Sequence, residues 1–243
     1  MKKICVIVPC FNEERRLNIE DFIEFQNLNS DFHLCFVNDG SLDNTKIILK
    51  NITTKATETS FLSLKNNVGK AEAIRFAIMQ KCNDYNWFAY IDADLSTPLS
   101  ELKRLYHIML FEKKKMVVAS RVKILGASIK RKAYRHIFGR MIATFVDKFI
   151  LQLEIYDTQC GAKIFDAQLA KELFKEPFKS NWLFDVELFA RAKKKYGIRF
   201  CKELILEIPL KQWHDTRDSR ITFWDVLETP FALIKLYLHY IKK

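Results

Sequence analysis

The sequence predicts a single α/β domain, in which helices cover both faces of a mostly parallel sheet. Short runs rich in β-branched and aromatic residues alternate with segments of helical periodicity, as in proteins built from strand–helix–strand units. Each run ends in polar, turn-prone residues, and in parallel sheets ligands bind beyond those strand ends. Only six glycines and five prolines in 243 residues leave little room for flexible linkers.

The alternation predicts five strands with four helices between them. We expect the strands at 3–8, 32–39, 61–64, 87–94 and 116–121, and the helices near 17–28, 42–52, 69–82 and 99–114. Polar clusters follow four of the strands: Asn12-Glu13-Glu14, Asn38-Asp39-Gly40-Ser41, Asp92-Ala93-Asp94 and Ser120-Arg121. Because the carboxyl ends of parallel strands share one edge of a sheet, we expect these clusters to meet in one crevice.

Composition is typical of a globular protein from a reducing compartment. The residues are 49% hydrophobic and 28% charged, which is ordinary for such proteins. The six cysteines form no CxxC pair and the five histidines are dispersed, so a zinc site is not expected. The chain begins with a short apolar run that turns polar by Asn12, which favours a first core strand over a signal peptide. We therefore expect a cytoplasmic protein.

A net charge of +11 indicates an anionic partner, and the excess charge is localised. Residues 113–148 carry eleven lysines and arginines against a single acid, Asp147. This segment alone supplies nearly all of the excess. Nucleic acid is one candidate polyanion, but the sequence has none of the usual nucleic-acid-binding motifs, so we expect no nucleic acid partner.

A basic amphipathic helix is predicted over 129–151. Its apolar side chains recur at helical spacing along one stripe, formed by Ile129, Ala133, Ile137, Met141, Phe145 and Phe149. Most of the lysines and arginines fall off that stripe. The helix could cover the sheet and expose its basic face to solvent, or it could lie in a membrane interface among anionic headgroups.

Residues 221–243 are expected to form a C-terminal extension of amphipathic helices on a domain that covers 1–220. Thr229-Pro230 should separate two short helices, with the threonine as N-cap and the proline at the first helical position. The second helix, of roughly 12 residues, would reach about 18 Å, short of a hydrocarbon core of about 30 Å. It can dock on protein or lie in the lipid surface, but it cannot span a bilayer.

Asp92 and Asp94 stand at the end of the expected strand 87–94, after a run of apolar and aromatic side chains. Successive side chains of a strand alternate between faces, so these two carboxylates should point the same way. One interpretation is a helix cap, since Ser96-Thr97-Pro98 is a plausible helix entrance. The other is a divalent cation, Mg²⁺ or Mn²⁺, held by hard oxygen ligands and completed by phosphate oxygens.

Two further turns could meet a nucleotide. Asp39 precedes Gly40, and a glycine there permits close approach of the backbone to a ligand. The Asp39 carboxylate could accept a hydrogen bond from the ring N–H of a uracil or guanine base, or it could simply cap an ordinary turn. Gly69 and Lys70 begin a helix, whose N-terminus could bind an anion. An ordinary surface lysine is equally compatible with this sequence.

Together these motifs resemble the family-2 glycosyltransferases of the GT-A fold. VPxFNEE, NDGSxDxT, NxGKxxA, DADLSxP and SR occur in the order typical of that family. Two more motifs, YDTQCGAKIFD (156–166) and WLFDVELFARAKKKYG (182–197), are similar to the dolichyl-phosphate glucosyltransferases, with the mannose synthases as close relatives. The resemblance covers roughly residues 3 to 220.

The resemblance implies an inverting transfer of a hexose from a nucleotide diphosphate sugar to a polyprenyl phosphate. It implies catalytic roles for Asp94, Asp185 and Arg121, with Asp92 and Asp94 as the metal ligands. The residues implied in binding the nucleotide sugar are Pro9, Asn12, Glu13, Asp39, Gly69, Lys70, Asp92 and Ala93. Those implied near the sugar and acceptor are Asp157, Gln159, Asp185 and Glu187.

A phosphate acceptor is also reasonable on chemical grounds. A sugar hydroxyl needs a general base, whereas a phosphate monoester is already ionised near neutral pH and needs only alignment and charge balance. Arginine suits that task because its planar fork binds phosphate bidentately. The candidate arginines are Arg121, Arg131, Arg135, Arg217 and Arg220. A lipid acceptor would place the enzyme peripherally on the inner face of the membrane, against its anionic surface.

The chain departs from the pattern of its relatives in three places. It has Asn38-Asp39 where DDGS is common, and Ala119-Ser120-Arg121 where GSR is common. Its Arg217-Asp218-Ser219-Arg220 also stands where the mannose synthases carry a different loop. These departures leave the acceptor loop and the choice of sugar open, and the motifs at 156–166 and 182–188 favour UDP-glucose over a GDP-sugar.

Three other functions are compatible with parts of the sequence. A family-2 enzyme with a glycan or other soluble acceptor would need a base, for which Asp157, Asp185 and Glu187 are available. A nucleotidyltransferase would share the nucleotide-binding sheet, but its glycine-rich N-terminal signature is replaced here by VPCFNEE. A nucleic-acid binder would explain the charge alone.

Overall fold

The computed structural model describes residues 4–130, 133–215 and 223–240, with the backbone alone over 133–138 and 223–228. The strands are β1 (Ile4–Cys10), β2 (Phe32–Asp39), β3 (Thr59–Leu64), β4 (Trp87–Tyr90), β5 (Met116–Ser120), β6 (Ser128–Lys130), β7 (Lys163–Asp166), β8 (Ile205–Pro209) and β9 (Gln212–His214). The helices are α1 (Ile19–Leu28), α2 (Thr45–Lys55), α3 (Lys70–Lys81), α4 (Leu99–Phe111), α5 (Ala133–Val146), α6 (Ala167–Leu173), α7 (Phe184–Leu204) and α8 (Phe223–Tyr240), and a π-helical turn η1 (Asp147–Leu151) follows α5.

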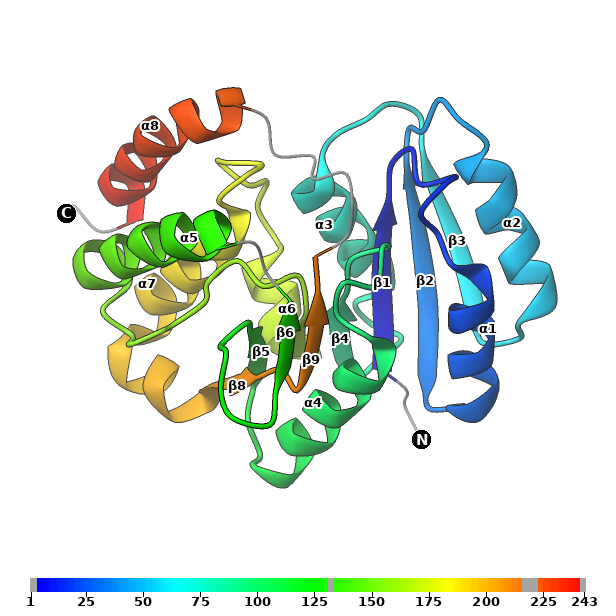
Figure 1. Ribbon diagram of the computed structural model, residues 1–243, viewed down its shortest axis with the longest axis horizontal. Helices are drawn as coiled ribbons and strands as arrows, with labels where there is room; N and C mark the ends of the chain where they lie inside the picture. The colour runs from blue at the N-terminus through cyan, green and yellow to red at the C-terminus, as the bar shows by residue number, and fades with distance from the viewer. Residues whose placement is uncertain (1–3, 131–132, 216–222, 241–243) are drawn as a thin grey trace.

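The central sheet has seven strands in the order β3-β2-β1-β4-β7-β5-β8 (Figure 1). Strand β7 runs antiparallel to both of its neighbours, and every other pair in this sheet is parallel. A separate parallel pair joins β6 to β9. The predicted α/β fold with a mostly parallel sheet is therefore confirmed.

Helices cover both faces of the sheet, and the strands alternate their side chains between two cores. In β1, Cys5 and Ile7 join the core that includes side chains of α3, α6, α7 and α8. Ile4, Val6 and Val8 join the opposite core, with side chains of α1, α2 and α4. This two-sided burial explains why the central strands read as nearly continuous apolar runs.

The basic segment at 129–151 differs from the single helix that periodicity predicts. Ile129 lies in β6 and pairs with Trp213 of β9. Helix α5 begins only at Ala133, and η1 continues it to Leu151. Met141, Phe145 and Phe149 of the predicted stripe are exposed, whereas Val146 and Ile150 face the core. The stripe therefore does not cover the sheet.

The predicted break in the C-terminal tail is wrong. Helix α8 is continuous from Phe223 to Tyr240, with Pro230 inside it. Leu233 and Leu236 are buried in the core that α7 shares. This packing holds the second half of the helix in line with the first half. Its free energy outweighs the cost of the backbone hydrogen bond that proline cannot donate. Within the described residues, no helix combines the length and apolar composition that crossing a bilayer requires.

Candidate active site

The first wall of the site is built by the loops that follow β1 and β2, which bind each other. The Asn12 N–H donates to Ser41 Oγ at 3.0 Å, and Asn12 Oδ1 accepts from the Leu42 N–H at 2.8 Å. The buried Glu13 is held in the same way, because its N–H donates to Thr45 Oγ1 at 2.7 Å. Together with Pro9 at the end of β1, these residues form one rigid corner at the carboxyl edge of the sheet.

Asp39 closes β2 and ties the β2 loop to the start of α3. Its two carboxylate oxygens accept the N–H groups of Val68 and Gly69 at 2.8 and 2.9 Å. Burial raises the pKa of Asp39, although these two hydrogen bonds act in the opposite direction. A Cβ on Gly40 would lie 2.4 Å from the carbonyl carbon of Asn66, so the close approach of these two loops requires a glycine.

Asp92 and Asp94 lie beyond β4, in the turn after it, and not in the extended strand that their sequence suggests. β4 ends at Tyr90. Asp94 Oδ1 accepts from the N–H and the hydroxyl of Ser96, at 3.0 and 2.9 Å. Helix α4 starts at Leu99 without a side-chain cap, so neither aspartate caps that helix.

A positively charged side chain lies next to each of the two carboxylates, those of Asp92 and Asp94. Lys70 Nζ donates to Asp92 Oδ1 at 2.5 Å. Arg16 pairs with Glu13 at 2.8 Å and places a second guanidinium nitrogen 3.5 Å from Asp94 Oδ2. Burial would lower the pKa of Lys70, but the carboxylates of Asp92 and Asp185 outweigh it and raise that pKa. Lys70 therefore belongs to the site and is not a plain surface lysine.

Beneath Asp92 lies a buried network that periodicity did not predict. Lys163 is fully buried, and its Nζ donates to Asp185 Oδ1 at 2.5 Å and to the Cys160 carbonyl at 2.8 Å. The Tyr90 hydroxyl also donates to Asp185 Oδ1. Asp185 thus links the start of α7 to β4 and β7, directly under the Asp92 turn.

Gly161 packs its backbone against Asp92. A Cβ at this position would lie 1.9 Å from Asp92 Oδ2. The turn at Cys160–Gly161 is itself held by Lys163 through the Cys160 carbonyl. The reversed strand β7 is what brings this turn beside β4.

At the other side of the site, Arg121 and Asp157 form a bidentate ion pair. Nε donates to Oδ2 at 2.7 Å and Nη2 donates to Oδ1 at 2.8 Å. Burial would lower the pKa of Arg121, but Asp157 more than compensates and raises it. Asp157 Oδ1 also accepts the Gln159 N–H, and Glu207 accepts the Asp157 N–H. The Arg121 charge is therefore largely balanced within the protein.

Glu187 does not join this cluster. Residues two apart on a helix face different directions, so Glu187 points away from Asp185. Its carboxylate is fully buried and accepts from Arg191, from the Tyr240 hydroxyl and from the Lys179 N–H. It joins α7 to α8 and to the loop before α7, which is a structural role.

Four of the predicted acceptor arginines cannot be placed in the cluster. Arg131, Arg217 and Arg220 lie outside the described residues, and only the backbone of Arg135, in α5, is described. Apart from Glu187, the other predicted residues are brought together: Ala93 is buried between Asp92 and Asp94, and Gln159 lies half-buried beside Asp157. Sequence reasoning missed Arg16, Tyr90, Gly161 and Lys163.

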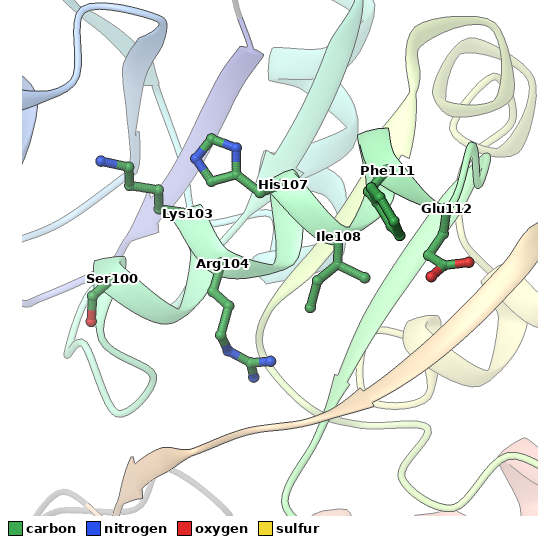
Figure 2. Close-up of a pocket in the computed structure, with 7 residues that line it drawn as sticks. All are labelled: Ser100, Lys103, Arg104, His107, Ile108, Phe111 and Glu112. Carbon is green, nitrogen blue, oxygen red and sulfur yellow. The ribbon is translucent and has the colours of Figure 1, made fainter.

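The surface also carries a hollow of about 520 Å³ away from these residues. It lies along α4 and is lined by Ser100, Lys103, Arg104, His107, Ile108, Phe111 and Glu112 (Figure 2). Figure 2 shows that all seven come from one helix face and its end, with Lys103 and Arg104 pointing in different directions. None of the four polar clusters contributes to it, so we place the functional site at the carboxyl edge of the sheet.

The Asp92–Asp94 pair fits a divalent cation that shares its ligands with a substrate. Both side chains offer hard carboxylate oxygens at the same turn. In the part of the chain that the structure describes, no three histidine, cysteine, aspartate or glutamate side chains gather into a metal-binding group. Mg²⁺ and Mn²⁺ are commonly held by one or two carboxylates and by substrate phosphates, which is the arrangement these two aspartates can support.

Comparison with known proteins agrees with this geometry. A dolichyl-phosphate beta-glucosyltransferase of Trichomonas vaginalis is 25% identical over 250 residues, which cover 96% of this chain and 70% of that protein. The enzyme of the same name from Dictyostelium discoideum is 31% identical, over 79% of this chain and 62% of its own length. The human enzyme is 27% identical over 99% of this chain and 76% of its own length.

Among solved structures, the glucosyl-3-phosphoglycerate synthase of Mycobacterium tuberculosis, crystallised with Mn²⁺, UDP and glucosyl-3-phosphoglycerate, has a similar fold. The TM-score is 0.71 at 17% sequence identity, over 98% of this chain and 80% of that one. The model of the family described as glycosyl transferase family 2 matches residues 5–174, which contain all four polar clusters. The chain is therefore a glycosyltransferase and belongs to glycosyl transferase family 2.

Proposed function

We propose that this enzyme transfers glucose from UDP-glucose to a polyprenyl phosphate, with inversion at the anomeric carbon. Support for the sugar and the acceptor comes from the relatives named dolichyl-phosphate beta-glucosyltransferase, at 25–31% identity over most of the chain. UDP, rather than GDP, is the expected nucleotide because the structural neighbour was crystallised with UDP.

One observation supports a phosphate acceptor over a hydroxyl. The three carboxylates that could act as a general base are each held by a cation: Asp157 by Arg121, Asp185 by Lys163 and Glu187 by Arg191. Each makes charge-assisted hydrogen bonds that would weaken on taking a proton from a sugar hydroxyl. A phosphate monoester is already ionised and needs no such base.

On the donor side, the corner formed by Pro9, Asn12 and Glu13 would line the nucleotide, and Asp39 would face its base. Asp92 and Asp94 would hold the divalent cation, which when bound neutralises the negative charge of the departing diphosphate. Lys70, at the N-terminus of α3, would add a second positive charge for that diphosphate. Asp185 and Lys163 would position the Asp92 turn from below.

On the acceptor side, Arg121, Asp157 and Gln159 would form one wall of the acceptor site. Arg131, Arg135, Arg217 and Arg220 would supply the forks that bind the lipid phosphate, because guanidinium binds phosphate bidentately. The localised charge of residues 113–148 would draw an anionic acceptor toward the site.

A lipid acceptor also requires access to a membrane, and two exposed apolar stripes suit this. Met141, Phe145 and Phe149 form one, on α5 and η1; Phe231, Ile234 and Leu238 form the other, on α8. All six side chains are more than half exposed. Both helices lie at the same end of the molecule, next to α7 (Figure 1). We propose that this end binds the anionic inner surface of the membrane from the cytoplasm.

The acceptor can be tested by product partition. The enzyme is incubated with radiolabelled UDP-glucose and Mn²⁺, in separate reactions with undecaprenyl phosphate, with undecaprenol and with a soluble glycan. We expect label in the organic phase only with undecaprenyl phosphate. Label that stays in the aqueous phase, on the glycan, would contradict the lipid phosphate acceptor.

A further inference from the structure

The contacts of Lys70 place its ammonium against the carboxylate that would bind a metal. Lys70 Nζ is 2.5 Å from Asp92 Oδ1 and lies 5.8 Å from the centre of the Tyr90 ring and 5.7 Å from that of Phe184. The two rings form an aromatic wall on which the ammonium rests. Lys70 is thus a built part of the site.

The negative charge of the second carboxylate, that of Asp94, is also balanced by a cationic side chain of the protein. Arg16 is held by Glu13 and reaches to 3.5 Å from Asp94 Oδ2. Asp94 Oδ1 is engaged by Ser96. A divalent cation entering without nucleotide would find two protein carboxylates, each already facing a positive charge. The protein alone therefore provides a poor metal site.

We propose that Lys70 keeps the divalent cation from Asp92 until a nucleoside diphosphate arrives, so that metal and nucleotide bind together. The inference rests on the proposed use of a nucleotide sugar. A diphosphate offers Lys70 new oxygen partners, and the ammonium can exchange Asp92 for them by rotation about its flexible four-carbon stem. Asp92 then becomes available to the metal, whose remaining ligands the phosphates supply.

The physical basis of the exchange is Coulombic. An ammonium a few ångströms from the metal position repels a divalent ion strongly in a partly buried site. When two or more phosphate charges enter, the same ammonium becomes attractive to the ligand that brings the metal. Lys70 would therefore disfavour the metal alone and favour the metal–nucleotide complex.

The test is a titration of the enzyme with Mn²⁺ in the absence of nucleotide. Binding is monitored through the electron paramagnetic resonance signal of the free ion. We expect Lys70→Met to bind Mn²⁺ alone about ten-fold more tightly than the unaltered enzyme. Lys70→Arg, which keeps the charge, should remain weak. Lys65→Met is the matched control, because Lys65 is an exposed lysine five residues away, and it should change nothing.

A second titration measures UDP in the presence of Mn²⁺ by calorimetry. Lys70→Met should bind UDP about ten-fold more weakly, since it has lost a partner for the diphosphate. Mn²⁺ affinity of Lys70→Met equal to or weaker than that of the unaltered enzyme would overturn the inference. The proposed function is tested separately: if the sugar or lipid assignment fails, the Mn²⁺ titration still gives a result, because it uses neither.

Discussion

At the scale of single residues, the carboxylate of Asp92 is confined on two sides. Lys70 Nζ contacts Oδ1, and the backbone of Gly161 lies against Oδ2. Its position therefore depends on a residue that has no side chain, 69 positions away in the sequence. Any atom added at Gly161 must displace the carboxylate or the turn that carries it.

We expect Gly161→Ala to lower kcat/KM for UDP-glucose by about a hundred-fold, because a shift of about 1 Å at a positioned group can cost that much. A Cβ there would lie 1.9 Å from Asp92 Oδ2. The measurement is steady-state kinetics together with circular dichroism. Gly126→Ala is the control: Gly126 has a φ of +84° and open space around it, so it should lose about 1 kcal/mol of stability and keep its activity. Normal kinetics for Gly161→Ala would contradict the assigned contact.

The buried ion pair between Lys163 and Asp185 should contribute to the free energy of unfolding. Lys163→Met leaves the Asp185 charge buried without its cation, which costs about 3 kcal/mol or more. Urea unfolding measures this loss. The double variant Lys163→Met with Asp185→Asn removes both charges and should recover part of it. If Lys163→Met unfolds at the same urea concentration as the unaltered protein, the pair does not stabilise the fold.

Residue-level reasoning from the sequence predicted site roles for Asp39, Asp92, Asp94 and Lys70, but not for Arg16, Gly161 and Lys163, which lie against or beneath them. Each of these aspartates follows an apolar run, which is a local signal. Lys163 gives no such local signal. Its side chain is buried against Asp185, which is distant in the fold's connectivity, and sequence windows do not show this contact. The resemblance implies a place in the site for both Asp185 and Glu187, although a helix turns residues two apart to different sides.

At the scale of elements, the alternation of strands and helices predicted β1 to β5 and the helices between them. It missed β6, β7, β8 and β9, each of three to five residues. β4 and β5 are as short as β7 and β8, but they alternate regularly with helices, whereas β6 to β9 break that alternation and pair with partners far away in the chain. β7 is the most important omission, because it inserts between β4 and β5 and carries Lys163.

The two sides of helix α8 differ in their exposure to solvent. Its buried side packs on α7, while Phe231, Ile234 and Leu238 are exposed. Replacing these three by serine should weaken binding to anionic vesicles by about ten-fold or more, because partial burial in the interface yields only a fraction of the roughly 1.5–3 kcal/mol that full burial of each large apolar side chain contributes. Vesicle co-sedimentation measures this.

The matched control carries the same number of exposed apolar residues elsewhere: Leu28, Leu42 and Phe111, also changed to serine. That variant should sediment with vesicles as the unaltered protein does. Equal sedimentation of both triple variants would mean that α8 does not bind the membrane. Deleting residues 222–243 is a less specific test, because it also uncovers the side of α7 that Leu233 and Leu236 cover.

At the scale of the whole molecule, the fold brings every turn of the site to one edge of a sheet. Three parallel strands, β1, β2 and β4, carry the residues that we propose bind the donor, and the reversed strand β7 returns the chain so that the 157–161 segment faces them. The sequence order of the motifs predicted the first part. The second part depends on a long-range pairing between β4 and β7, which no window of sequence reveals.

The most direct test of the whole account is glucose transfer by Asp94→Asn. The enzyme and the variant are given radiolabelled UDP-glucose, Mn²⁺ and undecaprenyl phosphate, and the organic-soluble label is counted. We expect the variant to lose about a hundred-fold or more of the transfer rate, since one of the two proposed metal ligands loses its charge, while its circular dichroism and vesicle binding stay the same. Full turnover by a folded Asp94→Asn would contradict the account.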